Sequence, residues 1–415
     1  MTPYRILVVD DSAFMRKLFS DIIGGDPSFT VVGTAATGAQ AVELLAALDP
    51  DAVTMDIEMP DMNGLEALRV IMGQKPTPVI MLSGLSEDNR RATVEALQYG
   101  AFDFIHKPTV MTADIDRVAE QLLSRLKSAV SVKLRSSLLP LPDKQAAKWP
   151  ENPASKAVAS AQATRAAPGG GARSNRKPAE PAPAESAASA APKKKASPAA
   201  RKPAVSPAAP GTPAVPKLPS RVAEFRHLIA IGTSTGGPRA LHQLIGSLPG
   251  NLPAPVLIVQ HMPPKFTHSL AQRLDSFSEL SVKEAEHGER VAAGTVYIAP
   301  GGYHMTLARA GGSYRIELSL GEPRGGHRPS VDLLFESLVP FVELARHAVI
   351  MTGMGSDGAK GMKALAASGA ETTIAESEET CIVFGMPRSA IELGAAKTVL
   401  PLHGIAPLLT EAVMK

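Results

Sequence analysis

Short apolar runs and longer amphipathic stretches alternate along the first 130 residues of the chain. The short runs are typical of buried strands, and the longer stretches have the spacing of helices. We expect strands at 4–9, 29–36, 51–56, 78–82 and 102–106, and helices at 12–24, 38–48, 64–73, 87–98 and 112–130. Strands that alternate with helices form parallel sheets covered on both faces. The pattern therefore predicts one compact α/β domain.

A similar alternation begins again near residue 227. We expect strands at 227–231, 255–260, 347–352, 371–375 and 396–400, and helices at 237–248, 331–344, 358–368, 387–392 and at the C-terminal end. Shorter strands are expected around 281–285, 295–299, 303–309 and 313–319, with a hairpin turn at Gly311-Gly312. This body is predicted to be a doubly wound α/β domain with a β-hairpin insert.

The segment between the two bodies has a different composition. Between 151 and 220 it contains 13 prolines and no Phe, Tyr, Trp or Ile. Such a segment cannot bury enough apolar area to offset the entropy of ordering it, so we expect a disordered linker. The predicted division is a first domain at 1–130, an Ala/Pro-rich basic linker at 131–225 and a second domain at 226–415. The run Lys193–Lys195 could form a polybasic contact, although solvated linker charge is the commoner role.

The charge of the chain is concentrated in this linker. The whole chain carries a net +3, but 151–220 alone contains eleven Lys or Arg and three Glu, so the rest is net acidic. We therefore expect no nucleic-acid partner, because nucleic-acid binding needs clustered basic charge on a folded module. The single cysteine excludes a disulfide framework. No apolar stretch approaches the ~18 residues that a membrane span needs, so we expect no membrane insertion and a cytoplasmic location.

Acidic side chains gather at predicted strand ends in the first body. Asp10 and Asp11 close the first strand, Asp56 the third and Ser83 the fourth, and Lys107 follows the fifth. Ligands of open parallel sheets bind at this edge. Neighbouring carboxylates repel each other unless a cation joins them, and an oxygen-only donor set suits Mg²⁺. Each residue alone could be a cap or a surface charge, but together they predict a phosphoryl-transfer site.

Five motifs in this body resemble the response-regulator receiver family, whose domain is flavodoxin-like with five parallel strands. They are Asp10-Asp11-Ser12, Val53-Thr-Met-Asp56-Ile-Glu-Met-Pro60, Asn63-Gly64, Ser83-Gly84 and Lys107-Pro108. The resemblance implies phosphorylation of Asp56 by a histidine kinase. It also implies a Mg²⁺ ion held near Asp10 by Asp11, Asp56 and the backbone carbonyl of Glu58, with Ser83 and Lys107 binding the phosphoryl group.

A candidate nucleophile stands at the first strand end of the second body. Ser234 lies in the glycine-rich turn 232–238, which follows a strand and precedes a helix. A turn of this kind can raise a serine above the sheet edge with a backbone N–H beside it, although small residues here can also form a plain tight turn or a phosphate loop. His261 closes the next parallel strand and is the candidate base, with His304 as its rival. Asp357, after a later strand, is the candidate orienting carboxylate.

Two other chemistries remain open on the residues alone. Gly353–Gly358 satisfies the G-x-G-x-x-G pattern and is followed by Glu376 at the spacing of a ribose-binding acid, so a dinucleotide-binding enzyme under receiver control is the alternative function. Cys381 could act as a nucleophile with a histidine, but a lone cysteine in an apolar run is more simply a small buried side chain. A scaffold without enzymatic activity is the third class.

Further motifs in 226–415 resemble the chemotaxis protein-glutamate methylesterase (CheB) family. They are Gly232–Pro238, Gln260-His-Met-Pro263, Ala299-Pro-Gly-Gly302, His327-Arg-Pro-Ser-Val-Asp332, Met351–Gly358 and Phe384-Gly-Met-Pro387. The resemblance implies a catalytic triad of Ser234, His261 and Asp357, and we expect the backbone amides of Thr235 and Met354 to hold the oxyanion. The implied substrates are methylated glutamates, and also glutamines, on chemoreceptors, which are partners together with the chemotaxis kinase. No cofactor is expected in this domain.

Overall fold

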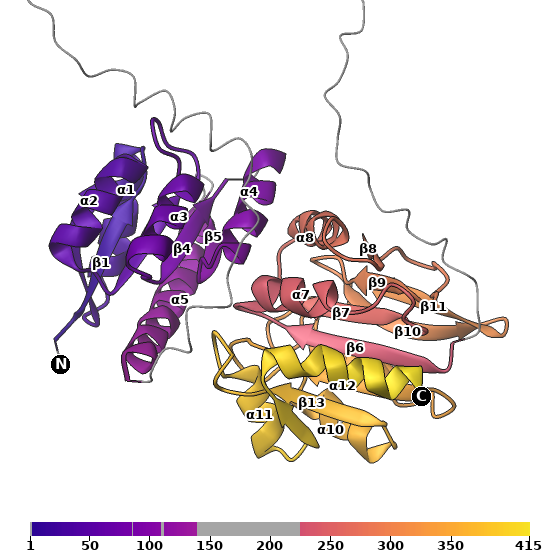
Figure 1. Ribbon diagram of the computed structural model, residues 1–415. Coiled ribbons are helices and arrows are strands. Elements are labelled where there is room, and N and C mark those ends of the chain that lie inside the picture. The colour runs from indigo at the N-terminus through magenta and orange to yellow at the C-terminus, as the bar shows by residue number, and fades with distance from the viewer. Residues whose placement is uncertain (1, 85, 109–111, 139–224) are drawn as a thin grey trace, which may run out of the picture. The chain divides into compact units, whose positions relative to one another are not determined.

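The computed structural model describes residues 2–84, 86–108, 112–138 and 225–415 (Figure 1). By their contacts, the described residues on both sides of 139–224 belong to one compact unit. The segment 139–224, which makes up most of the predicted linker, lies outside the described residues.

The N-terminal body is a five-stranded parallel sheet in the order β2-β1-β3-β4-β5, the flavodoxin-like arrangement expected from the sequence. Its strands are β1 (Tyr4–Val9), β2 (Phe29–Ala35), β3 (Ala52–Asp56), β4 (Val79–Ser83) and β5 (Asp103–His106). Its helices are α1 (Ala13–Gly24), α2 (Gly38–Leu48), α3 (Gly64–Gln74), α4 (Glu87–Gln98) and α5 (Thr112–Leu138). The last helix continues beyond its predicted end at residue 130, into the segment expected to be linker.

Helices cover both faces of this sheet because its strands are apolar on both sides. In β1, Ile6 and Val8 pack in one cluster with side chains of α1 and α5, whereas Leu7 and Val9 pack in another with side chains of α2, α3 and α4. Alternate residues of a strand point to opposite faces, so this strand is buried on both. With both faces covered, the ends of the strands are the places open for chemistry.

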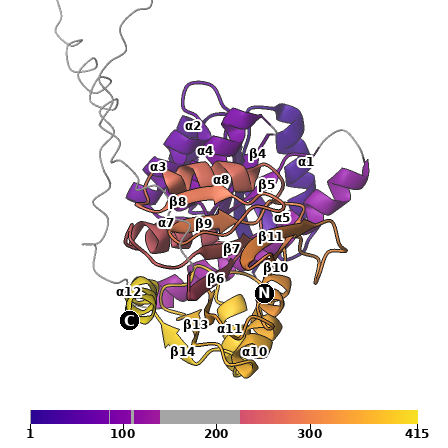
Figure 2. The ribbon, with the colours of Figure 1, turned by 90° about the vertical axis from the view of Figure 1, so that its right-hand side faces the viewer.

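The C-terminal body is built on a seven-stranded parallel sheet in the order β14-β13-β12-β6-β7-β9-β8. Its strands are β6 (His227–Thr233), β7 (Val256–Gln260), β8 (Ser281–Glu284), β9 (Thr295–Ile298), β12 (Ala345–Ile350), β13 (Thr372–Glu376) and β14 (Thr398–Leu400). Its helices are α7 (Gly237–Gly246), α8 (Phe266–Asp275), α9 (Val331–Ser337), α10 (Ala359–Ala367), α11 (Met386–Glu392) and α12 (Leu402–Met414). A separate antiparallel hairpin consists of β10 (His304–Ala310) and β11 (Ser313–Ser319), which confirms the predicted insert. Figures 1 and 2 show the hairpin beside the main sheet.

The structure departs from the sequence prediction at three places in this body. β8 and β9 extend the main parallel sheet and are not part of the hairpin insert. The helix expected at 331–344 ends at Ser337, ahead of Pro340, which has no N–H for a helical bond and disfavours a helical residue before it. Helix α8 is absent from the sequence prediction. Its apolar spacing is helical, but it follows two prolines and its N-cap, Lys265, makes no side-chain cap bond.

Candidate functional site

The acidic residues predicted at the N-terminal sheet edge lie together. Asp10 follows β1, Asp56 ends β3 and Lys107 follows β5. The Lys107 ammonium is 2.8 Å from Oδ2 of Asp10 and 2.8 Å from Oδ2 of Asp56. Carboxylate oxygens of Asp10, Asp11 and Asp56 all lie within 4.8 Å of one another. Three carboxylates at this separation form an oxygen-only donor set, which fits a hard divalent cation such as Mg²⁺.

Burial sets the electrostatics of this edge. It raises the pKa of Asp56 to about 6, although the hydrogen bond and charge of Lys107 oppose the shift. Burial lowers the pKa of Lys107, but its bonds to Asp10 and Asp56 outweigh that effect and the net shift is upward. The lysine therefore stays charged beside the carboxylates, where it would neutralise an incoming anionic group.

The two other predicted members of the phosphoryl site lie at its border. Ser83 ends β4, but its hydroxyl is fully buried and lies 2.7 Å from Oγ1 of Thr93. Glu58 is exposed and lines a hollow with Asp11 and Asn63. The structure thus gathers the three aspartates with Lys107, while the Ser83 hydroxyl would have to leave Thr93 to reach a ligand.

In the C-terminal body the candidate residues lie at the ends of adjacent strands. Thr233 of β6 pairs with Gln260 of β7. Ser234 and His261 are the residues after this pair, so they lie side by side at the same edge of the sheet. β12 is the neighbour of β6 on its other side and leads into the loop that carries Asp357. The parallel strands therefore bring the three predicted residues to one edge, where sheets of this kind hold their ligands.

Close backbone packing holds the Ser234 turn. The N–H of Ser234 donates to the carbonyl of Thr352 at 3.0 Å, and the N–H of Gly237 donates to the carbonyl of Ser234 at 2.8 Å. Gly236 adopts a φ of 81°, which favours glycine. A Cβ on Gly353 would lie 2.8 Å from Cβ of Ser234, so the loop after β12 can approach the serine only with glycine there.

A buried glutamine joins the serine turn to the histidine. The Nε2 of Gln260 donates to the carbonyl of Ser234 at 2.9 Å and to the carbonyl of His261 at 3.1 Å. Its Oε1 accepts a short hydrogen bond from the Thr233 hydroxyl. The side chain is only 2% exposed, so its hydrogen-bonding capacity serves this site. Periodicity marks Gln260 only as a strand residue, and its polarity at a buried strand end was the signal for a further role.

Asp357 is the best-anchored member of the site. Its Oδ2 lies 2.8 Å from Nε2 of His261 and accepts from the N–H of Val331 at 2.7 Å. Its Oδ1 accepts from the Ser330 hydroxyl at 2.9 Å and from the N–H of Asp332 at 3.0 Å. Burial raises the pKa of Asp357, but His261 and these N–H groups outweigh it and lower the pKa to about 2. The carboxylate is therefore ionised and fixed in orientation beside the imidazole.

One histidine that the sequence did not single out lies against the site. The ring of His327 is parallel to that of His261, with centroids 3.8 Å apart and planes within 2°. Burial, and the charge of His261, lower the pKa of His327 to about 4, so it is neutral near pH 7. The signal in the sequence was its place at the head of the His327-Arg-Pro-Ser-Val-Asp332 motif.

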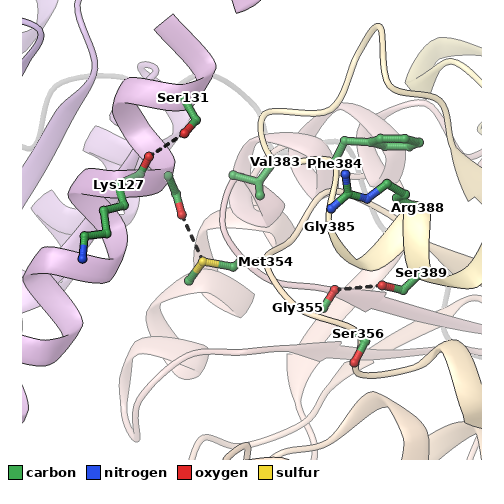
Figure 3. A pocket seen from close by; sticks show the side chains of 11 residues that line it. Lys127, Ser131, Met354, Gly355, Ser356, Val383, Phe384, Gly385, Arg388 and Ser389 are labelled. Carbon is green, nitrogen blue, oxygen red and sulfur yellow. Dashed lines mark hydrogen bonds between the residues drawn. The ribbon is translucent and has the colours of Figure 1, made fainter. Parts of the chain in front are cut away.

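The backbone N–H groups of Thr235 and Met354 are the candidates for holding an oxyanion. Within the described residues, the N–H groups of Thr235 and Met354 have no hydrogen-bond acceptor. Met354 lines a pocket of about 530 Å³ together with Phe384 and Arg388 (Figure 3). Ser128 of α5 also lines this pocket, and its hydroxyl lies 3.0 Å from the Met354 sulfur. The residue after the serine is also engaged from the N-terminal body, because the Thr235 hydroxyl donates to Oδ2 of Asp103 at 2.6 Å.

Comparison with known proteins identifies two family domains in this chain. A family model for the response regulator receiver domain matches residues 6–119, and one for CheB methylesterase matches residues 229–409. A protein-glutamate methylesterase/protein-glutamine glutaminase of Symbiobacterium thermophilum is 42% identical over 414 residues, which cover 99% of this chain and 97% of that protein. The chain belongs to the CheB methylesterase family.

Two further CheB proteins are similar to this chain. A protein-glutamate methylesterase/protein-glutamine glutaminase from Geobacillus kaustophilus is 40% identical, covering 100% of this chain and 99% of its own. The crystal structure of the Thermotoga maritima CheB methylesterase catalytic domain is 49% identical, covers 46% of this chain and 100% of its own, and has a TM-score of 0.45. Among the described helices of this CheB-family chain, none has the length and hydropathy to cross a membrane.

The rival residues have other roles in this CheB-family structure. Nε2 of His304 lies 3.0 Å from the carbonyl of Glu322, on the hairpin and not beside Asp357. Glu376 is fully buried and accepts from the N–H of Thr352 at 2.8 Å and the Thr380 hydroxyl at 2.9 Å, so it does not project as a ribose-binding acid would. Burial and the nearby Glu376 raise the pKa of the Cys381 thiol, which disfavours the nucleophilic thiolate.

Proposed function

We propose that this chain demethylates glutamate methyl esters, and deamidates glutamines, on the cytoplasmic domains of chemoreceptors. The names of its full-length relatives state both activities. The structural observation that supports the proposal is the 2.8 Å contact of His261 with Asp357 at the sheet edge where Ser234 follows the neighbouring strand. A cytoplasmic location follows from the proposed substrate and is part of the same proposal.

The proposed chemistry is covalent catalysis by Ser234. Nε2 of His261 is held by Asp357, so Nδ1, which is buried and has no partner among the described residues, accepts the serine proton. Oγ then bonds to the γ-carbonyl carbon, and the proton passes to the leaving group as methanol or ammonia departs. Water next attacks the acyl-enzyme, gives its proton to His261 and releases the glutamate carboxylate. Ser234 recovers its proton in the last step.

The oxyanion of each tetrahedral intermediate needs donors that are already in place. We propose the free N–H groups of Thr235 and Met354 for this role. Such preorganised donors stabilise charge in the transition state without reorganising, and loss of one typically costs about 10²–10³ in kcat. The glycine at 353 supports this role, because it allows the Met354 loop to lie against Ser234.

Methanol release from a methylated receptor fragment tests the proposal. Ser234→Ala should reduce the rate by at least about 10³-fold while the protein keeps its thermal unfolding midpoint. Ser247→Ala, at the exposed end of the helix that follows the turn, is the matched control and should retain the wild-type rate. Unchanged methanol release by the Ser234 variant would disprove the assignment.

We further propose that phosphorylation of Asp56 by the chemotaxis histidine kinase activates the enzyme. Mg²⁺ would be held by Asp10, Asp11, Asp56 and the backbone carbonyl of Glu58, and it would neutralise charge as the phosphoryl group arrives. Lys107 contacts both inner carboxylates and would pair with the phosphoryl oxygens, and Ser83 would bond one of them. A small-molecule phosphoryl donor with Mg²⁺ should therefore raise the rate of wild type, while Asp56→Asn should show no response. A full response by the Asp56 variant would contradict this mechanism.

A further inference from the structure

His327 covers one face of the candidate base. Its ring lies parallel to that of His261 at 3.8 Å between centroids, and its nitrogens make no hydrogen bond within the described residues. The polar interactions of the described residues therefore leave this ring to act on His261 through its flat face. Rotation of the His261 ring out of its plane would break the stack together with the bond between Nε2 and Asp357.

A built turn holds His327 in this place. The backbone N–H of His327 donates to the carbonyl of Arg324 at 3.0 Å, and the N–H of Arg324 donates back to the carbonyl of His327 at 3.0 Å. Gly325 and Gly326 complete the turn with φ values of 59° and 84°, which favour glycine. The backbone of His327 is thus tied to Arg324.

The Arg324 side chain fastens this turn to helix α9. Its two terminal nitrogens pair with the two carboxylate oxygens of Glu336, one of them at 2.7 Å. A bidentate pair fixes direction as well as distance. The opposite end of the same helix carries Val331 and Asp332, whose N–H groups hold Asp357. One helix therefore supports both the edge of the His261 ring, through Asp357, and its face, through His327.

We propose that His327 is a positioning residue for His261, held in place by the Arg324–Glu336 pair. The inference rests on the proposed function, in which His261 transfers a proton in both halves of the reaction. Nδ1 can serve Ser234 only while Nε2 stays on Asp357, so a ring that leaves its plane interrupts each transfer. The stack should then affect turnover and leave substrate binding unchanged.

Two substitutions at 327 separate stacking from hydrogen bonding. In full-length protein, His327→Ala removes the ring and should lower kcat by about tenfold or more, because small misplacements of a catalytic group are costly. KM should stay within about twofold, as expected when an interaction acts only in the transition state. His327→Phe restores a flat ring without nitrogens and should keep kcat within about threefold of wild type.

A third variant tests the support. Glu336→Gln should lower kcat by about threefold with KM unchanged, because it weakens the bidentate pair. Glu343→Gln is the matched control, since Glu343 pairs with Arg309 on the hairpin and should keep the wild-type kcat.

The outcomes that overturn the inference are separate from those that overturn the function. A folded His327→Ala variant with normal kcat, or a folded His327→Phe variant that loses tenfold, shows that the ring does not act by stacking. If the alanine variant fails to fold, the other two variants decide. A tenfold loss of kcat in His327→Phe, or a wild-type kcat in Glu336→Gln, then overturns the inference. Ser234→Ala tests the function independently.

Discussion

Gln260 is the residue whose importance is clearest from the structure and least clear from the sequence. Its amide donates to the carbonyls of Ser234 and His261, so one side chain sets the spacing of the proposed nucleophile and base. A glutamate in this place would present acceptors to both carbonyls. A buried group left without a partner costs about 1–3 kcal/mol, more if charged.

We therefore expect Gln260→Glu to lower kcat by about 10–100-fold and to reduce the free energy of unfolding by about 1–3 kcal/mol. Methanol release and chemical denaturation would measure the two effects. Gln243→Glu makes the same change at an exposed position of α7 and serves as the control. If the two variants had the same kcat and the same free energy of unfolding, Gln260 would have no role in positioning Ser234 and His261.

Asp357 gives the stability of the protein a defined dependence on pH. Its pKa is about 2 in the folded protein, against 3.8 for an unperturbed aspartate, so the folded state binds its proton less readily. The stabilisation is present above about pH 4 and is lost as pH falls toward 2, and it amounts to about 2 kcal/mol. In denaturation experiments, the difference in unfolding free energy between wild type and Asp357→Asn should shrink over that window. A difference that stays constant from about pH 5 to pH 2 would contradict the anchoring of this carboxylate.

The residues that sequence reasoning identified share a simple signal. Ser234 and His261 each directly follow an apolar strand, and the parallel order of the strands brings them together. His327 lacks that signal, because its contact with His261 depends on a turn that returns to the site from outside the sheet. Such a contact depends on tertiary placement, which periodicity does not report.

Helices α9 and α10 pack more closely than their sequences suggest. A Cβ on Gly361 would lie 2.6 Å from the carbonyl oxygen of Asp332 and 2.9 Å from its Cα. The Asp332 carboxylate in turn accepts from the N–H of Gly361. This contact holds α9, whose first N–H groups bind Asp357, against α10, which follows Asp357 in the chain.

Alanine normally stabilises a helix relative to glycine by about 0.5–1 kcal/mol. For Gly361→Ala we expect the opposite sign, a loss of about 1–3 kcal/mol, because the backbone of Asp332 must move. Gly246→Ala is the matched control, since a Cβ there meets nothing within 4 Å, and it should be neutral or stabilising. Thermal unfolding of both variants would show the difference in sign. If both substitutions stabilised the protein, α9 and α10 could move apart without loss of unfolding free energy.

The hydrophobic pattern of the chain predicted most helices and strands, and its failures have physical causes. The apolar period of α9 continues beyond Ser337, so periodicity alone extended the helix past Pro340. Likewise β8 and β9 were expected among the short strands that precede the Gly311-Gly312 hairpin, although they pair in parallel through a crossover and extend the main sheet. Two successive strands pair in parallel or antiparallel according to how the loop between them runs. The composition of the short segment between β8 and β9 does not reveal this.

At the scale of the whole molecule, the contact of Asp103 with Thr235 joins the receiver to the turn that carries Ser234. Asp103 begins β5 and also pairs with Arg125 of α5, and its Oδ2 accepts from the hydroxyl of Thr235, the residue after Ser234. Phe104 stacks on Phe266 at 4.8 Å between ring centroids in the same region. These contacts are the candidate restraint that the proposed phosphorylation of Asp56 would release.

Asp103→Ala should then raise methanol release by up to about tenfold without a phosphoryl donor, as loss of one charge-assisted hydrogen bond allows. The fully phosphorylated rate should not change. Asp21→Ala, which removes an exposed partner of Lys17 on α1, is the control. If the Asp103 variant keeps the low basal rate, this contact does not restrain the enzyme.

The sequence predicted the two-body plan of the molecule, and the family supports it along its full length. The linker expected between the bodies remains a prediction, because 139–224 lies outside the described residues. What composition could not supply was the pairing of particular residues across the bodies, such as Asp103 with Thr235. Such pairs depend on shape complementarity between surfaces, which has no periodic signature.

The environment of Cys381 makes this protein convenient for spectroscopy. It is the single cysteine of the chain, and burial beside Glu376 raises its pKa, so little reactive thiolate forms near neutral pH. A new exposed cysteine would react with a maleimide dye far faster than the native one. Pairs of such labels, one on each body, would report by energy transfer how the distance between the bodies responds to a phosphoryl donor, with the natural thiol left in place.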